Sequence, residues 1–234
     1  MILRGIAARR RPARWPRAGD AERFFLAGQI LSLRGKLPGM SAAPDLVLAS
    51  TSPYRRELLA RLGLPFRVVA PACDEEALKL PGLGAEALAA RLARAKAESL
   101  LATEPGATLI GSDQLVALGD TLLGKPGTRA RAAEQLARLA GRTHLLVTAV
   151  AVLHDGRVLE HLDVTRLSMR PLSREQIERY LTADAPLDCA GSYKLEARGI
   201  TLFERIDAAD HSAITGLPLI ALTSLLASVG YPVP

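Results

Sequence analysis

The segment VLASTSPYRRELL, residues 47–59, combines side chains that can hold a phosphate group. An apolar run breaks into a turn of hydroxyl side chains that ends at Ser52, and a helical stretch follows with Arg55 and Arg56 in its first turn. Pro53 favours a helix start, because the N–H that proline lacks would have no partner there. Free N–H groups at a helix N-terminus bind anions, and guanidinium groups add to that binding. The segment therefore predicts an anion site, with a capped helix and two solvated arginines as the alternative.

A second segment with chemical potential is GSDQ, residues 111–114. An apolar run leads directly into Asp113, which predicts a carboxylate at the end of a strand, beside a glycine that leaves room for a ligand. Active residues of α/β proteins gather at such strand ends. A carboxylate there can act as a general base or bind a metal ion. The alternative is that Asp113 only caps a turn.

Further charged residues could complete a phosphate site. Lys125 precedes Pro126, which fixes the backbone and could aim the ammonium group at a phosphate. Lys96 lies in a helical stretch, and for both lysines a solvated surface position is the alternative. Asp74 and Glu75 follow a predicted strand and could provide carboxylates for a divalent ion.

A late loop, DCAGSYKLEARGI at residues 188–200, combines small residues with Lys194 and Glu196. Loops of this kind can close on a ligand. The four histidines show no metal-ligand spacing, and no Ser-His-Asp arrangement can be argued. Neither G-x-x-x-x-G-K-[ST] nor G-x-G-x-x-G occurs.

The elements that must position these residues alternate between strand and helix patterns. Strands are predicted at 45–50, 65–70, 107–112, 143–153, 157–169 and 199–206, and helices after Pro53 and at 85–102, 128–140, 173–181 and 217–229. Gly119–Asp120 and Asp155–Gly156 are typical of hairpin turns. The pattern predicts an α/β fold with a mixed sheet.

The net charge of +6 is concentrated near the N-terminus. Residues 1–43 carry nine basic and two acidic side chains, and the remaining chain carries 21 basic and 22 acidic ones. The body is therefore near neutral, which argues against nucleic acid as a partner. No apolar run is long enough to span a membrane. Two distant cysteines, Cys73 and Cys189, suit a reducing cytoplasm.

Residues 1–43 predict a basic, disordered extension that precedes one domain at 44–234. A targeting segment, or upstream sequence before a start at Met40, are the other interpretations. We favour an extension without function over a nucleic-acid-binding arm, because no aromatic stacking pattern accompanies the arginines.

Taken in order, these segments resemble the Maf family of nucleotide pyrophosphatases. The resemblance rests on LASTSPYRRELL, Asp74-Glu75, ARAKA, GSDQ, GKP, CAGSYKLEARGITLFERI and HSAITGLPL, and it covers about residues 45–230. It implies a Maf/ITPase-like α/β fold, with an elongated mixed sheet and two lobes around a deep cleft. It also implies a house-cleaning cytoplasmic enzyme that hydrolyses nucleoside triphosphates to the monophosphate and pyrophosphate with a divalent metal, Mg²⁺ or else Mn²⁺. A homodimer is one assembly that would be compatible with it.

The resemblance gives each motif residue a role. Asp113 matches the catalytic proton acceptor, and Glu75 with Asp113 would hold the metal. The residues that match phosphate- and substrate-binding positions are Ser52, Arg55, Lys96, Lys125 and Lys194. Cationic groups at these positions would neutralise a triphosphate.

Substrate choice in the family depends on three positions, which here are Tyr54, Gln114 and Glu196. The set resembles the 7-methyl-GTP branch, except that Tyr54 replaces the usual tryptophan. An aromatic face can stack on a positively charged methylated guanine, and a carboxylate can accept hydrogen bonds from the guanine edge. The alternatives are a dTTP/UTP pyrophosphatase and a non-enzymatic regulator of cell division.

Overall fold

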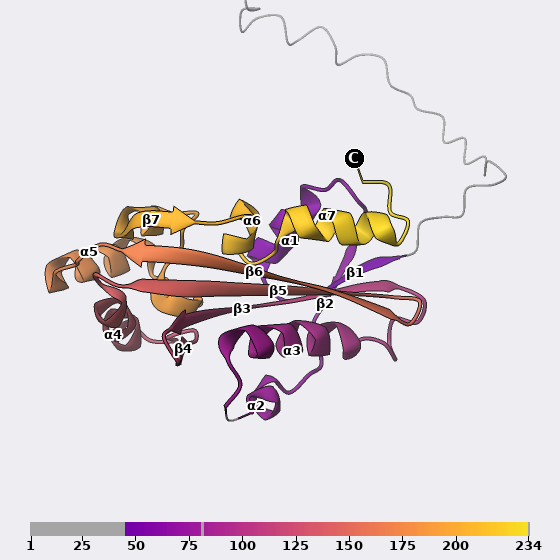
Figure 1. Cartoon of the computed structure of the whole chain (residues 1–234), viewed down its shortest axis with the longest axis horizontal. Coiled ribbons are helices and arrows are strands. Elements are labelled where there is room, and N and C mark those ends of the chain that lie inside the picture. The colour runs from indigo at the N-terminus through magenta and orange to yellow at the C-terminus, as the bar shows by residue number, and fades with distance from the viewer. Residues whose placement is uncertain (1–44, 81, 234) are drawn as a thin grey trace, which may run out of the picture. The chain divides into compact units, whose positions relative to one another are not determined.

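A computed structural model describes residues 45–80 and 82–233, which form a seven-stranded mixed sheet with helices on both faces (Figure 1). The strand order is β2-β1-β3-β5-β6-β7, and β4 pairs with β3 outside this path. The strands are β1 (Leu46–Ala49), β2 (Arg67–Val69), β3 (Thr108–Leu118), β4 (Thr121–Leu123), β5 (Thr143–His154), β6 (Arg157–Met169) and β7 (Phe203–Asp207). The predicted α/β class with a mixed sheet is confirmed.

Five of the described α-helices begin at a residue whose side chain accepts from a backbone N–H of the first turn. The α-helices of the described chain are α1 (Pro53–Ala60), α2 (Glu75–Leu78), α3 (Ala85–Glu98), α4 (Arg129–Leu139), α5 (Arg174–Asp184), α6 (His211–Ile214) and α7 (Leu219–Ser228), with 3₁₀ turns η2 (Ala190–Ser192) and η3 (Arg198–Leu202). Pro53 occupies the first turn of α1, as predicted. Ser173 and Gln176 form a reciprocal capping box at α5.

The pairing of β3 changes along its length. Its first half pairs in parallel with β1, ending at Ala49 opposite Gly111. Its last residues pair with β4, beginning at Val116 opposite Leu123. Between these two partners, residues 112–115 have no strand beside them on this edge within the described chain, although the other edge continues against β5. The sheet therefore carries an open interval in its middle, and the cleft described below lies there.

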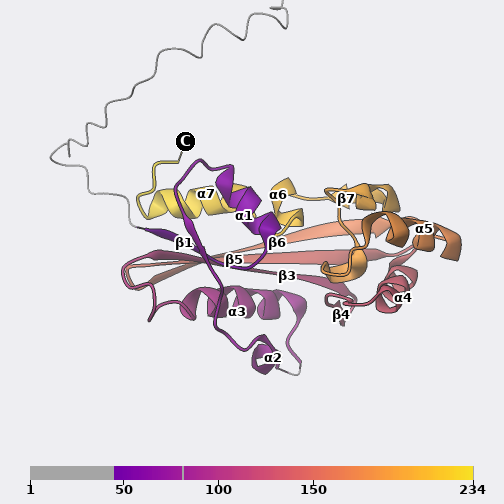
Figure 2. The same cartoon turned by 180° about the vertical axis from the view of Figure 1, so that it is seen from behind.

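The elements on either side of this interval form two lobes with separate hydrophobic clusters. In the first lobe, α3 covers one face of the sheet, and α1 and α7 cover the other (Figures 1 and 2). In the second lobe, α4 and α5 pack on β4, β7 and the far ends of the long strands. Members of that second core include Leu136, Leu139, Tyr180, Leu181 and Phe203. The predicted two-lobed arrangement is confirmed.

Gly111 sets how closely α3 approaches the sheet. A Cβ atom on Gly111 would lie 2.0 Å from the carbonyl oxygen of Ala93 in α3, so only glycine fits. The expectation that Gly111 leaves room for a ligand is therefore wrong, because backbone of α3 fills that space. The close contact brings Lys96, one helical turn past Ala93, onto the strand that carries Asp113.

Other boundaries also differ from the sequence prediction. The strand predicted at 107–112 continues to Leu118, so Asp113 lies inside β3 rather than at its end. Asp113 nevertheless lies just past the point where β1, the parallel neighbour of β3, ends. The strand predicted at 199–206 begins as the 3₁₀ turn η3, because the N–H of Gly199 turns back to the carbonyl of Lys194 at 2.9 Å. The hairpin turns at Gly119–Asp120 and Asp155–Gly156 are confirmed.

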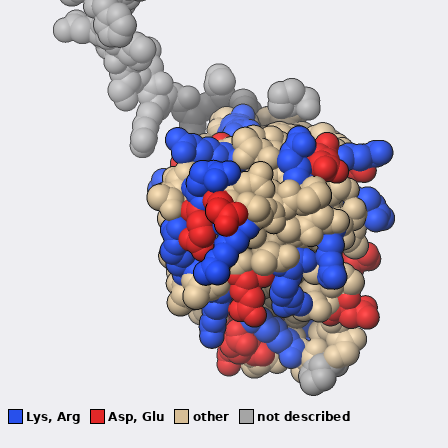
Figure 3. Space-filling model, turned by 90° about the vertical axis from the view of Figure 1, so that its left-hand side faces the viewer, with Lys and Arg blue, Asp and Glu red and all other residues tan. Residues whose placement is uncertain are grey.

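Charge on the end of the molecule that bears α4 and α5 is of both signs. Lys and Arg side chains there alternate with Asp and Glu (Figure 3). The basic extension predicted at 1–43 lies outside the described residues. Within the part of the chain that the structure describes, no helix combines the length and apolar character needed to cross a membrane.

Candidate active site

A cleft of about 660 Å³ lies between the two lobes at the open interval of β3. Nearly all of the site residues predicted from the sequence line it: Ser52, Tyr54, Arg55, Glu75, Lys96, Asp113, Gln114, Lys125 and Glu196. Lys194 is outside the lining, but its ammonium group lies 3.1 Å from the carboxylate of Asp188, which does line the cleft. The structure therefore brings together side chains from residue 52 to residue 196.

The floor of the cleft is a buried charge cluster. The Nζ atom of Lys96 lies 2.6 Å from Oδ1 of Asp113 and 3.1 Å from Oε1 of Glu75. Lys96 and Asp113 are each 6% exposed, so the surface alternative for Lys96 is wrong. Buried charges are stable only when they are paired, and this pair holds the Asp113 carboxylate in a defined position.

Arg55 extends from the first turn of α1 across the first lobe. Its Nε donates to the carbonyl oxygen of Gly216 at 2.8 Å, and among the described residues none accepts from its two Nη groups. Burial lowers the pKa of Arg55, while the nearby carboxylates of Asp113 and Glu75 oppose that effect. Its guanidinium group remains charged at neutral pH and can face an anion.

The hydroxyls of the first turn cap the helix. Ser52 accepts from the backbone N–H of Arg55 at 3.4 Å, and Ser50 accepts from the N–H of Ser52 at 3.1 Å. The capped-helix alternative is therefore correct for Ser52, and Ser50 supports the cap residue from the preceding turn. The same turn still lines the cleft, so the cap and the anion interpretation are compatible.

The late loop is fastened to the second lobe through its backbone and its aromatic side chain. The N–H of Lys194 donates to the Tyr180 hydroxyl at 2.9 Å, and Tyr193 pairs with Nε2 of His144 at 3.0 Å. Burial lowers the pKa of Lys194, but its hydrogen bonds with Asp188 and Tyr54 outweigh burial and hold the pKa above its ordinary value. Lys194 is therefore cationic and lies within reach of α1.

Cys189 lies in the cleft wall without nucleophilic character. Burial raises the pKa of its thiol to about 12. A thiol that stays protonated at neutral pH is a poor nucleophile, which argues against Cys189 as a covalent catalyst.

The sequence did not predict that the segment 213–216 holds residues of this site in place. The Gly216 carbonyl accepts from both Arg55 and the buried hydroxyl of Ser112, the latter at 2.9 Å. The amide nitrogen of Gln114 donates to the carbonyls of Ala213 and Ile214. The motif HSAITGLPL is visible in the sequence, but the contacts are made by its backbone carbonyls. Every residue type has such a carbonyl, so the side chains of the motif give no sign of this role.

The fit of a divalent metal depends on the two carboxylates that share Lys96. Within residues 45–80 and 82–233, no group of three or more His, Cys, Asp or Glu is placed to hold a metal ion. Magnesium in proteins is often bound by one or two carboxylates, with waters and substrate phosphates completing the shell. Glu75 and Asp113 therefore fit such an ion when a phosphate-bearing ligand supplies the remaining oxygens.

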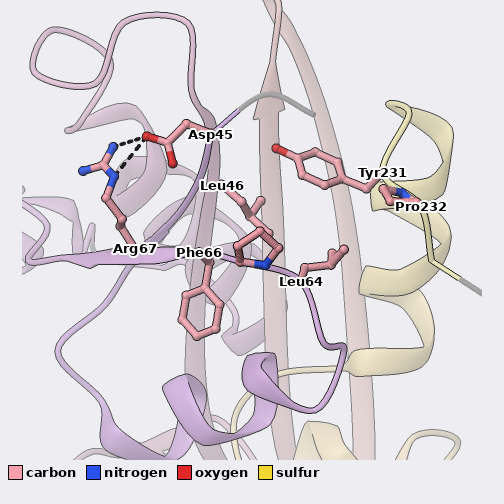
Figure 4. Close-up of a pocket in the computed structure, with 8 residues that line it drawn as sticks. Asp45, Leu46, Leu64, Phe66, Arg67, Tyr231 and Pro232 are labelled. Carbon is pink, nitrogen blue, oxygen red and sulfur yellow. Dashed lines mark hydrogen bonds and ion pairs between the residues drawn. The ribbon is translucent and has the colours of Figure 1, made fainter. Parts of the chain in front are cut away.

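A second cavity, of about 400 Å³, lies at the start of β1 and shares no lining residue with the cleft (Figure 4). Its walls are mainly apolar, including Leu46, Leu64 and Phe66. The ion pair of Asp45 with Arg67, which also lines it, is exposed to solvent. The described residues that surround this cavity form no cluster of groups suited to catalysis.

Comparison with known proteins identifies the family of this chain. The family model described as "Maf-like protein" matches residues 45–229. A protein of Xanthomonas oryzae pv. oryzae named 7-methyl-GTP pyrophosphatase is 49% identical over 82% of this chain and 100% of its own length. A Ralstonia nicotianae protein of the same name is 50% identical over 81% of this chain and 97% of its own. The chain belongs to the Maf family.

A third relative, from Bdellovibrio bacteriovorus, carries the name 7-methyl-GTP pyrophosphatase and is 48% identical over 78% of this chain and 95% of its own length. Among solved structures, a HAM1 protein from Coxiella burnetii aligns with 79% of this chain and 99% of its own at 14% identity and a TM-score of 0.41. That structural similarity is too low to add to the argument.

Proposed function

We propose that this chain is a nucleoside triphosphate pyrophosphatase that acts on 7-methyl-GTP or a closely related modified nucleotide. One observation carries the proposal: the buried Asp113–Lys96 pair lies at the floor of a cleft that also contains Arg55 and Lys125. The relatives named 7-methyl-GTP pyrophosphatase, about half identical along nearly their whole length, support the substrate.

The reaction would proceed by attack of water on the α-phosphorus. Asp113 accepts a proton from the water as its oxygen bonds to phosphorus, and the bond from the α-phosphorus to the bridging oxygen breaks. Pyrophosphate then leaves with the bonding electrons, and the nucleoside monophosphate remains. Lys96 keeps the Asp113 carboxylate aimed at the water, which makes it a positioning residue as well as a source of charge.

Cations from both lobes would stabilise the charge that develops on the phosphates. Arg55 and Lys96 come from the first lobe, and Lys125 comes from the β4–α4 connection in the second. Ser52 and Lys194 complete the phosphate-binding set. Glu75 and Asp113 would hold a divalent cation, Mg²⁺ or else Mn²⁺, which when bound supplies positive charge to the phosphate oxygens.

Base selection would depend on Tyr54, Gln114 and Glu196, which all line the cleft. The Tyr54 ring can stack on a methylated purine that carries positive charge. Glu196 is exposed at the cleft and can accept hydrogen bonds from a guanine edge. The cytoplasm as the compartment and a homodimer as the assembly remain part of this proposal.

A panel of nucleotides tests the proposed function. Purified protein with Mg²⁺ is given 7-methyl-GTP, GTP, dTTP and UTP, and release of pyrophosphate is measured for each. We expect the highest kcat/KM with 7-methyl-GTP. A higher kcat/KM with dTTP or UTP would assign the chain to the pyrimidine branch. Absence of turnover with every nucleotide, with Mg²⁺ and Mn²⁺ alike, would favour the non-enzymatic role in cell division.

A further inference from the structure

The segment from Asp210 to Leu219 presents a row of backbone carbonyls to the cleft residues. The Ala213 carbonyl accepts from Gln114 and from the buried hydroxyl of Thr148, each at 2.9 Å. The Ile214 carbonyl accepts from Gln114 at 3.0 Å. The Gly216 carbonyl also accepts from Arg55 and Ser112. This short stretch therefore holds both Arg55, proposed to face phosphate, and Gln114, proposed to face the base.

Asp210 ties this segment together at two points. One carboxylate oxygen accepts from the backbone N–H of Ser212 at 2.8 Å and from its hydroxyl at 2.5 Å. The other oxygen accepts from the N–H of Ile220 at 2.8 Å. The Ser212 hydroxyl in turn accepts from the N–H of Leu219 at 2.8 Å. A carboxylate that accepts several N–H and O–H donors holds them more strongly than a neutral group does.

The burial of Asp210 strengthens this network. Asp210 is only 6% exposed, so water competes little for its oxygens. Its contacts close the segment into a loop, with residues 212 and 220 held by one side chain. Asp113 and Lys96 come from β3 and α3, and their side chains bond to each other rather than to this loop. The loop contacts β3 at Ser112 and Gln114, on either side of Asp113, while the bond that holds the Asp113 carboxylate comes from Lys96.

We propose that Asp210 is a positioning residue for nucleotide binding, acting through the 213–216 carbonyls on Arg55 and Gln114. The proposal rests on the proposed function, because it takes Arg55 to face phosphate and Gln114 to face the base. Loss of the Asp210 carboxylate releases the carbonyl row, and both side chains then lose their fixed orientation. Binding weakens, while Asp113 keeps its hydrogen bond from Lys96.

The test compares Asp210→Asn with wild type in kcat and KM for the best nucleotide. Asparagine keeps the shape but turns an NH₂ group toward N–H donors. We expect KM to rise roughly 10-fold, with a smaller fall in kcat, because Arg55 also faces the charge that develops on the phosphates during the reaction. The matched control is Glu104→Gln, which removes an ion pair with Arg67 at the second cavity, and neither residue lines the cleft. Its KM is expected to remain unchanged at a similar loss of melting temperature.

Ser212→Ala provides a milder variant should Asp210→Asn fail to fold, since it removes only the hydroxyl that links Asp210 to Leu219. Its expected change is a smaller rise in KM in the same direction. The Kd of an α,β-methylene nucleotide, which cannot be cleaved, measures binding independently of turnover. Absence of turnover by wild type would overturn the proposed function. A KM and Kd that move no more in Asp210→Asn than in Glu104→Gln would overturn the role of Asp210.

Discussion

Asp113 is held by one lysine, which also contacts Glu75, so the floor of the cleft depends on few side chains. Lys96 places the carboxylate, and the carboxylate is the group with the basicity to take a proton from water. The role of the carboxylate can therefore be tested separately from that of Lys96, because a neutral residue of the same shape at position 113 removes only the base.

Asp113→Asn is expected to lower kcat by roughly 10²-fold or more, because asparagine cannot accept the proton of the attacking water. The measurement is steady-state pyrophosphate release with Mg²⁺. Asp207→Asn is the matched control, since Asp207 pairs with Arg205 on the surface of the second lobe. Near-normal turnover in Asp113→Asn would remove this residue from the mechanism.

Tyr54 gives a second prediction, about base preference. A cation–π contribution of about 0.5–2 kcal/mol corresponds to a preference of roughly 2- to 30-fold for 7-methyl-GTP over GTP. Tyr54→Ala is expected to raise KM for 7-methyl-GTP far more than for GTP. Tyr54→Phe keeps the ring and loses only the hydroxyl that bonds Lys194, so it should retain the preference. Equal losses for both nucleotides in Tyr54→Ala would show that the ring does not stack.

The charged side chains of the candidate site could be predicted from the sequence because their residue types indicate their chemistry. Asp113, Lys125 and Arg55 could be selected on charge and context, and the cleft brings them together. For Lys96 the sequence leaves a lysine of the phosphate site and a solvated surface lysine as alternatives, because no sequence pattern says that a lysine in a helix is buried. The residues Asp210, Thr148 and Ser112 could not be selected, since their contacts go to backbone groups whose position depends on the tertiary fold.

At the scale of elements, the contact of α3 with β3 decides the geometry of the site. Glycine at 111 admits the helix backbone, and the helix then delivers Lys96 to Asp113. The hairpin from β5 to β6 was predictable because Asp-Gly is a favoured pair in two-residue hairpin turns, which need positive φ angles. Asp155 and Gly156 adopt such angles, 46° and 73°. The 3₁₀ turn η3 was not, because an apolar stretch after a glycine has the same pattern as a strand start.

Gly111→Ala is expected to destabilise the protein and lower its activity together. The new methyl group would meet the Ala93 carbonyl, so α3 must move and carry Lys96 away from Asp113. Overpacking of this kind typically costs about 1–3 kcal/mol, and thermal unfolding with a turnover assay measures both effects. Gly84→Ala at the start of the same helix is the control, because nothing lies within 4 Å of the place that its methyl group would take. Unchanged activity in Gly111→Ala would show that the close approach does not set the site.

For the whole molecule, a buried histidine links stability to pH. Burial lowers the pKa of His144 to about 4, from an ordinary 6.5, and its Nδ1 has no hydrogen-bond partner among the described residues. Between pH 6.5 and pH 4 the unfolded chain therefore binds a proton that the folded chain does not. The free energy of unfolding falls as the pH falls across this window, by about 3 kcal/mol in all, and the loss is complete below about pH 4.

His144→Phe is expected to flatten this acid dependence, even though it also loses the bond to Tyr193. Urea unfolding at a series of pH values gives the slope for each protein. Replacing the exposed His211 by Gln is the control for loss of a histidine elsewhere. Identical slopes for wild type and His144→Phe would mean that another group accounts for the acid sensitivity.

The unbroken strands have a mechanical consequence. β3, β5 and β6 run without interruption from the first lobe into the second, past the open interval at residues 112–115. A cleft whose walls share three continuous strands has no loop among them that could serve as a pivot. Any change in the width of the cleft must therefore come from bending and twisting of these strands. Hydrogen–deuterium exchange should then show the amides of β5 protected throughout nucleotide binding, and rapid exchange confined to its middle would contradict this behaviour.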